Sequence, residues 1–280
     1  MSFSGETIDT TGAIEAEFNY LKPMPQRPRY YAENPPPGTP RSNATSETHR
    51  LPVRDIRASA SAFSLDEHGF AVVRQASALG DFKDEAEIRD IYYPEVEALV
   101  RSVTGADRVF IFDHVVRHHI PGTDDLRGGI RQPAWRVHVD HTARSAPQRV
   151  RDLLPESASK LLGGRVQIIN VWRPIRGPVQ DAPLALCAAG TVVADDLVPS
   201  DLVYPERIGE TYSVTYNSAH RWFYLSRMVP AEAFLIKCFD SRTDGRARFT
   251  PHCAFKDPTA SADAPRRRSI EIRTLVFHDA

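Results

Sequence analysis

The sequence predicts a mainly β protein of the barrel or jelly-roll type, with helices packed outside the strands. Nine segments with strand-like hydrophobic patterns follow one another over residues 108–277, and their connections are mostly short and rich in turn residues. By contrast, apolar residues recur at helical spacing mainly in residues 83–105. Many short strands with few helices are typical of two packed sheets or a closed barrel, so we expect this architecture.

Residues 1–55 are expected to form an extended N-terminal arm that precedes a single domain over residues 56–280. Residues 22–50 are rich in proline and polar side chains. Such a composition favours an extended chain with little regular structure of its own. Tyr30 and Tyr31 offer apolar surface in this arm, so we expect it to wrap over the domain.

The domain is expected to begin with a short strand and a helix. Gly69 precedes the apolar stretch FAVVR at residues 70–74, which predicts a strand. In residues 83–105 the apolar side chains follow the spacing of a helix. Pro94 should break or kink this helix, and Gly105 should end it.

From residue 107 onward the hydrophobic pattern changes to that of strands. β-branched and aromatic residues dominate these segments, and turn-forming residues separate many of them. The nine expected strands cover residues 108–118, 136–142, 165–174, 183–189, 210–217, 220–228, 233–241, 248–255 and 268–277. A short helix is expected over residues 146–155, between the second and third of these strands.

Composition narrows the classes of partner and the compartment. The chain has 280 residues and a net charge of −1, so it lacks the basic excess that nucleic-acid binding requires. No apolar run approaches the roughly 18 to 20 residues of a membrane span, and the N-terminus does not resemble a secretory signal. Cys187, Cys238 and Cys253 are too few and too scattered for a disulfide framework. We therefore expect a cytoplasmic protein with a small-molecule partner, and the oligomeric state stays open.

The strand expected over residues 136–142 carries a histidine and an aspartate on one face. Because a strand repeats every two residues, Arg136, His138, Asp140 and Thr142 share that face. A histidine and a carboxylate are two of the three ligands of a facial iron site. The alternative interpretation is a solvated polar face on an amphipathic strand.

Two histidines are candidates for the third ligand. His252 opens a late strand, and Arg267 and Ser269 follow it at the start of the last strand. A guanidinium there can bind a carboxylate through two hydrogen bonds, and the serine adds a hydroxyl donor. We therefore favour His252, while His220, also at a strand start, remains the alternative third ligand. For Arg267 the alternative is a solvated basic run.

Together these residues resemble the pattern of the Fe(II)/2-oxoglutarate-dependent oxygenases, which is H-x-D, a distal histidine and R-x-S. The segments INVWRPIRGPVQDAPLALC, YNSAHRWFYLSRM, AFLIKCFDSRTDGRARFTPHCAF and RSIEIRTLVF are similar to a subgroup from microbial natural-product pathways. Members of this subgroup are hydroxylases/desaturases related to cephalosporin methoxylases. The resemblance covers about residues 60–280 and implies a double-stranded β-helix (jelly roll) with flanking helices.

The resemblance also implies the chemistry. Iron(II) would be held by His138, Asp140 and His252, and 2-oxoglutarate, used with O2, would be anchored by Arg267 and Ser269. The enzyme would be a dioxygenase that hydroxylates, desaturates or cyclises a small natural-product intermediate. Candidate substrate-facing aromatic residues, with core packing as the alternative, are Trp172, Tyr216, Trp222 and Tyr224. Two other classes remain open: a cupin-like metal enzyme that does not use 2-oxoglutarate, and a non-catalytic β-roll binding protein.

Overall fold

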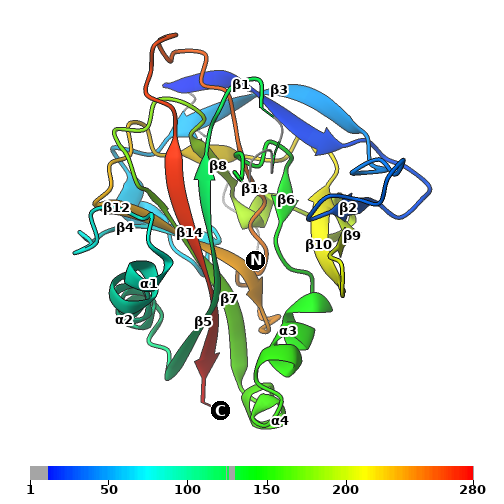
Figure 1. Ribbon diagram of the computed structural model, residues 1–280, viewed down its shortest axis with the longest axis vertical. Coiled ribbons are helices and arrows are strands. Elements are labelled where there is room, and N and C mark those ends of the chain that lie inside the picture. The colour runs from blue at the N-terminus through cyan, green and yellow to red at the C-terminus, as the bar shows by residue number, and fades with distance from the viewer. Residues whose placement is uncertain (1–11, 124, 126–129, 280) are drawn as a thin grey trace.

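The computed structural model describes residues 12–123, 125 and 130–279, and these residues form two facing β-sheets with helices at the periphery (Figure 1). In the nine-stranded sheet the order is β1 (Ala13–Leu21), β3 (Ser46–Asp55), β11 (Trp222–Tyr224), β8 (Leu184–Cys187), β13 (His252–Ala254), β6 (His138–Val139), β10 (Ile208–Val214), β9 (Leu197–Val203) and β2 (Arg29–Tyr31). In the five-stranded sheet the order is β4 (Phe70–Arg74), β12 (Glu232–Asp240), β7 (Arg165–Pro174), β14 (Arg268–His278) and β5 (Arg108–His118). The mainly β prediction is confirmed.

The space between the two sheets is filled by the inward side chains of alternating strand residues. On β7, Ile168 and Trp172 point into this core, whereas Ile169 and Val171 point to the opposite face of the strand. β7 is covered on both faces, so it is buried along almost its whole length and carries apolar residues on both faces rather than on one. This burial explains why it was recognisable as a strand from the sequence.

The helices that precede β5 cover the outer face of the five-stranded sheet, and those that follow β6 pack against the core between the sheets. α1 (Glu85–Glu87), a π-helical turn, η2 (Ile88–Tyr92), and α2 (Tyr93–Thr104) lie beside the five-stranded sheet, whereas α3 (Ser145–Leu153) and α4 (Ala158–Leu161) lie on the other side of the molecule (Figure 1). Short 3-10 turns are η1 (Ala60–Ala62), η4 (Ala189–Thr191) and η5 (Ala194–Asp196). Pro94 stands in the first turn of α2 and Gly105, with a φ of 66°, ends it, as expected. No helix among these is long and apolar enough to cross a bilayer.

The N-terminal segment contributes more strand than the sequence predicted. β1 and β3 pair along their length, and β3 then runs parallel to β11, where Val53 pairs with Trp222. The expectation of little regular structure over residues 22–50 is therefore wrong where β3 begins. β3 has mostly exposed and polar side chains, so it carries no hydrophobic alternation to reveal it. Residues 1–11 lie outside the described part, and a domain boundary after residue 55 stays a prediction.

Several other strands differ in extent from their predicted ranges. Only His138 and Val139 of the expected strand 136–142 form β6, and β11 is limited to three residues. β9 was not predicted at all, because its sequence LVPSDLV contains a proline and an aspartate that indicate a turn. Pro199 lies opposite Tyr212 of β10, and its other side is outside the pairing of β9 with β2, which begins at Asp201, so a missing N–H is tolerated there. These differences concern strand ends and an added strand, and they leave the order of the predicted strands along the chain intact.

Candidate active site

His138, Asp140 and His252 come together where two short strands meet. β6 and β13 are antiparallel neighbours, and His138 is paired directly with His252 in their register. The imidazole centroids are 4.5 Å apart, and Nε2 of His138 lies 3.4 Å from Oδ1 of Asp140. One ligand atom from each of the three residues lies within 4.8 Å of the others. This is the spacing of three groups that can bind one metal ion on one side.

Each of the two imidazole rings is fixed by a hydrogen bond at its other nitrogen. Nδ1 of His138 lies 2.9 Å from the carbonyl oxygen of Arg136, and Nδ1 of His252 lies 3.0 Å from that of Thr250. A carbonyl only accepts, so in each ring Nδ1 carries the proton and Nε2 keeps a free lone pair. Both Nε2 atoms are therefore prepared to be metal ligands.

The carboxylate of Asp140 is held at one oxygen and free at the other. Its Oδ2 accepts hydrogen bonds from Nδ2 of Asn170, at 2.8 Å, and Nε of Arg273, at 3.2 Å. The Arg273 guanidinium also forms ion pairs with Asp113, at 2.9 Å, and Glu271, at 3.1 Å. Oδ1 remains directed to the histidines, which suits a ligand that binds through one oxygen.

The protonation states of this group fit a metal site. Burial and the neighbouring His252 lower the pKa of His138 to about 4, so the ring is neutral near pH 7. Burial raises the pKa of Asp140, but the charge of Arg273 and the adjacent His138 ring outweigh it and hold this pKa well below its ordinary value. Neutral imidazole nitrogens and a carboxylate oxygen form the donor set that Fe(II) accepts in its facial sites.

His220, the alternative third ligand, lies elsewhere and has partners at both ring nitrogens. Its Nδ1 is 3.0 Å from the Tyr20 hydroxyl, and its Nε2 is 3.1 Å from Oδ2 of Asp196. Trp222 donates to the same hydroxyl from its indole nitrogen, at 2.8 Å. His220 is thus part of a buried hydrogen-bond network, and the structure brings His252 rather than His220 to His138 and Asp140.

Arg267 and Ser269 supply buried donors without partners. Arg267 is 3% exposed and Ser269 is 1% exposed, and neither Nε of Arg267 nor Oγ of Ser269 has a hydrogen-bond partner. Burial and the nearby Arg117 lower the pKa of Arg267 to about 9. A buried guanidinium in such surroundings is stabilised by an anion, and unpaired buried donors normally mark a missing partner. These residues therefore fit the carboxylate of 2-oxoglutarate.

The three consecutive arginines, 266 to 268, differ in burial, as the two-residue repeat of a strand predicts. Arg266 is exposed and forms an ion pair with Asp181, whereas Arg267 is buried, and its Nη1 donates to the carbonyl of Ala182. Arg268 is only partly buried and opens β14. Arg267 is therefore the inward member of the run.

Asn170 and Arg273 are two site residues that the sequence did not reveal. Both lie on strands that were predicted, β7 and β14, and both project to the inner face. A polar residue inside an otherwise apolar strand was the available signal. This signal does not predict which residue the polar side chain contacts, because the pairing of β7 with β14 brings both residues to Asp140.

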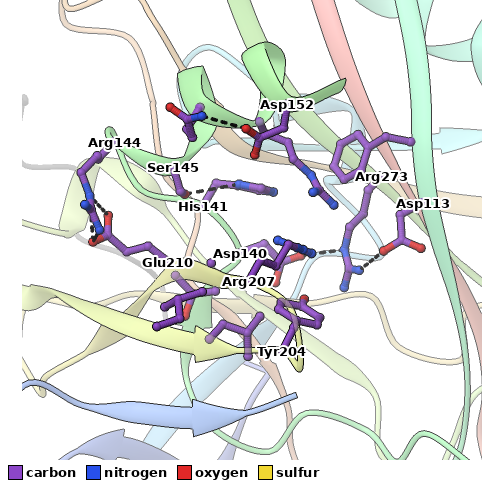
Figure 2. Close-up of a pocket in the computed structure, with 17 residues that line it drawn as sticks. Asp113, Asp140, His141, Arg144, Ser145, Asp152, Tyr204, Arg207, Glu210 and Arg273 are labelled. Carbon is purple, nitrogen blue, oxygen red and sulfur yellow. Dashed lines mark hydrogen bonds and ion pairs between the residues drawn. The ribbon is translucent and has the colours of Figure 1, made fainter. Parts of the chain in front are cut away.

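Two cavities adjoin Asp140. The one drawn in Figure 2, of about 440 Å³, has Asp140, Tyr204, Arg207 and Arg273 among its lining residues. A second, of about 700 Å³, is lined by both His138 and Asp140 and shares Tyr204 and Arg273 with the first. The candidate metal ligands thus open onto space for small molecules, within the range of ligand sites.

The four aromatic residues considered as substrate contacts lie in core clusters. Trp172 packs in the core between the sheets, 5.5 Å from the Arg267 guanidinium carbon. Tyr216, Trp222 and Tyr224 belong to a separate cluster around β1 and β11. None of the four lines a described cavity, so core packing, the alternative interpretation, accounts for their positions.

Comparisons with known proteins agree with this geometry. The family model described as "Oxidoreductase/YMDC permease-like domain" matches residues 18–277. The Fe(II)/2-oxoglutarate-dependent dioxygenase nvfI of Aspergillus novofumigatus is 36% identical over 255 residues, which cover 89% of this chain and 90% of that protein. The hydroxylase/desaturase efuI of Hormonema carpetanum is 36% identical over 251 residues, which cover 82% and 84%.

A solved structure gives the same result for the fold. The iron and alpha-ketoglutarate-dependent endoperoxidase NvfI superposes with a TM-score of 0.87 and 32% identity, over 96% of this chain and 99% of that one. This confirms the jelly-roll prediction, and the two other classes of function gain no support. The chain therefore belongs to the Fe(II)/2-oxoglutarate-dependent dioxygenase family of natural-product biosynthesis, whose cofactor is Fe(II) and whose co-substrates are 2-oxoglutarate and O2.

Proposed function

We propose that His138, Asp140 and His252 hold the iron, and that Arg267 and Ser269 bind the distal carboxylate of 2-oxoglutarate. The observation that carries the proposal is the triad itself: three ligand atoms within 4.8 Å, with both histidine Nδ1 atoms already bonded to carbonyl oxygens. The reaction is oxidation of a small natural-product intermediate by hydroxylation, desaturation or oxidative ring formation.

The iron supplies the reaction of O2 that couples decarboxylation of 2-oxoglutarate to oxidation of the substrate. The protein residues orient the reactants around it. The two Nε2 atoms and Oδ1 of Asp140 would hold the metal, and a set of only three protein ligands would leave room for co-substrate and O2. Asn170 and Arg273 keep Oδ2 of Asp140 occupied, which holds the carboxylate in one orientation.

The co-substrate site needs a donor pair away from the metal. Arg267 offers its free Nε and Ser269 its free hydroxyl, from neighbouring inward positions at the start of β14. A guanidinium beside a hydroxyl suits a carboxylate, because both groups donate and the charge is complementary. Binding would remove the energetic cost of leaving two buried donors unpaired.

The proposal includes a cytoplasmic location. Cys187, Cys238 and Cys253 are all buried and free, and unpaired cysteines are usual in a reducing compartment. The substrate partner is a small molecule, and no nucleic-acid or membrane partner is proposed.

Anaerobic titration of the purified protein with Fe(II) and 2-oxoglutarate tests this function. We expect a weak visible charge-transfer band that saturates at one equivalent of each, and succinate release when a pathway metabolite that serves as substrate is added with O2. The Asp140→Ala variant is the control and should lack the band. A visible band that forms with Fe(II) alone and does not depend on 2-oxoglutarate would contradict the co-substrate assignment.

A further inference from the structure

Several buried polar atoms near Asp140 have no partner, Nε2 of Gln132 and Oδ1 of Asn170 among them. Two more are Nη1 of Arg136 and Oγ1 of Thr211, and both residues line the cavity of about 700 Å³ that contains His138 and Asp140. β10 and β6 are antiparallel, and Tyr212 of β10 pairs with Val139 of β6. The same register places Thr211, the residue before Tyr212, beside Asp140, the residue after Val139. Neither atom is used by the metal triad or by the Arg267 site.

Arg136 is held so that its donors remain available. Its guanidinium carbon lies 4.2 Å from the centroid of the Tyr30 ring. Stacking of this kind covers the flat face of a guanidinium and leaves the N–H groups at its edge free. Asp140 is the carboxylate whose charge attracts the Arg136 guanidinium. Its Oδ2 already accepts hydrogen bonds from Asn170 and Arg273.

Three other arginines on the wall of this cavity form ion pairs with carboxylates, whereas Arg117, which also lines it, donates to the carbonyl of Gln132 and has no carboxylate partner among the described residues. Arg273 pairs with Asp113 and Asp140, and Arg41 and Arg131 both pair with Asp125. Like Arg117, Arg136 contributes a positive charge without a carboxylate partner among the described residues; the residue is half-buried, and its Nη1 is fully covered. Burial of an unpaired charge is costly, so an anion that reaches Arg136 gains an unusually favourable contact.

A single 2-oxoglutarate does not account for both donor pairs. Arg267 and Ser269 lie at the start of β14 in the five-stranded sheet, and the charges acting on Arg267 are those of Arg117, Asp181 and Glu271. Arg136 and Thr211 belong to the nine-stranded sheet, beside Tyr30. Arg136 and Thr211 line the cavity of about 700 Å³, whereas Arg267 and Ser269 are not among its lining residues. One carboxylate of 2-oxoglutarate would bind the metal and the other would bind Arg267 and Ser269, so a further carboxylate would satisfy the second pair.

The remaining lining indicates what carries that group. Tyr31, Trp135, Leu202 and Tyr204 add apolar and aromatic surface to the same cavity, and the neighbouring cavity in Figure 2 shares Thr211, Leu202 and Tyr204 with it. We propose that Arg136 and Thr211 form a substrate subsite that binds a carboxylate, so the substrate class is a small carboxylic acid with an apolar or aromatic body. This deepens the proposed function and rests on it.

Isothermal titration calorimetry of the anaerobic Fe(II)-loaded protein, saturated with 2-oxoglutarate, tests the subsite with benzoate as the probe. We expect saturable binding in the millimolar range, weaker binding of neutral benzamide, and at least about a tenfold loss of benzoate affinity in Arg136→Gln. The matched control is Arg267→Gln, in which 2-oxoglutarate affinity should fall while benzoate affinity is retained.

Thr211→Val gives a second test that does not depend on the folding of the Arg136 variant. Valine keeps the shape of the β10 side chain, and no hydrogen bond of the free protein is lost, because Oγ1 has no partner. Benzoate affinity should fall a few-fold with an unchanged melting temperature.

The outcomes separate this inference from the proposed function. Absence of saturable benzoate binding in the wild type, equal affinities for benzoate and benzamide, or unchanged binding in Arg136→Gln would overturn the subsite. Loss of 2-oxoglutarate affinity in Arg136→Gln as large as in Arg267→Gln would assign Arg136 to the co-substrate and overturn it as well. Failure of the wild type to bind 2-oxoglutarate would instead overturn the proposed function.

Discussion

The two histidines of the candidate metal centre are oriented by the same kind of hydrogen bond to the nearby backbone. Each ring bonds through Nδ1 to the carbonyl oxygen two residues earlier, Arg136 for His138 and Thr250 for His252. The orientation of each Nε2 lone pair therefore depends on nearby backbone. Asp140 differs, because its orientation depends on Asn170 of β7 and on a residue of β14, which are distant in sequence.

His252→Ala and His220→Ala should separate metal binding from folding. Loss of His252 removes one of three ligands, so we expect metal affinity to fall at least about 100-fold with little change in folding. Loss of His220 removes one buried hydrogen-bond partner each from the Tyr20 hydroxyl and from Asp196, which should lower the free energy of unfolding by about 1–3 kcal/mol and leave metal affinity unchanged. Metal content after gel filtration measures the loss of metal binding. Urea denaturation measures the free energy of unfolding. The reverse pattern would make His220 the third ligand.

Arg267→Ala and Arg268→Ala should differ strongly in their effect on 2-oxoglutarate. Arg267 is buried with a free donor, whereas Arg268 is partly exposed beside it on the opposite face of the strand. Loss of a desolvated contact with a carboxylate should weaken 2-oxoglutarate binding about 100-fold, and Arg268→Ala should change it less than about threefold. Anaerobic titration of the charge-transfer band gives both constants. Small, equal effects would mean that the co-substrate carboxylate binds elsewhere.

At the scale of elements, the start of β4 supports the segment that leads into β13. Thr250 donates its hydroxyl to the carbonyl of Gly69 at 2.8 Å, and the carbonyl of Thr250 in turn orients His252. Gly69 has a φ of +86°, and a Cβ there would lie 2.2 Å from Oγ1 of Thr250. Glycine is required at this position by both the backbone conformation and the close approach.

Gly69→Ala should therefore weaken the metal site from a distance. The methyl group would displace Thr250, and we expect a loss of roughly 2 kcal/mol or more of folding free energy together with weaker metal binding. Gly80→Ala is the control, because a Cβ at Gly80 has nothing within 4 Å and should be close to neutral. Thermal melts with and without Fe(II), under anaerobic conditions, measure both effects. Metal affinity equal to that of the control would show that His252 does not depend on Thr250.

The sequence predicted the limits of strands accurately where both faces of the strand are buried, and poorly where one face is exposed or the strand is very short. β7 and β12 are buried along almost their whole length, with apolar residues on both faces, and were recognised with accurate limits. β3 is largely exposed, and β6 reaches only two residues, so local pattern could not define them. His138 and Asp140 were predictable because their two-residue spacing is local. The contacts of Asp140 were not, because they depend on pairing between strands that are far apart in sequence.

At the scale of the whole molecule, the N-terminal strands cover apolar surface behind the metal ligands. Phe18 of β1 is fully buried and stacks on Trp222 at 4.4 Å between ring centroids. The same cluster contains Val137 and Cys253, the sequence neighbours of His138 and His252. The side of β6 and β13 that faces away from the metal is thus packed against the N-terminal segment.

Phe18→Ala tests whether this segment is a separable arm or part of the domain. Loss of a fully buried phenylalanine should lower the free energy of unfolding by about 3–5 kcal/mol, because it removes apolar burial and leaves a cavity. The neighbouring Glu17→Ala is the control: Glu17 is exposed on the other face of β1, so its loss should change stability by less than about 0.5 kcal/mol. Urea denaturation gives both values. We expect one cooperative transition in Phe18→Ala, shifted to lower urea, because β3 continues into the pairing with β11 and both sheets would unfold together. A separate early transition, or a Phe18→Ala protein as stable as Glu17→Ala, would mean that the segment folds as an arm apart from the dioxygenase domain.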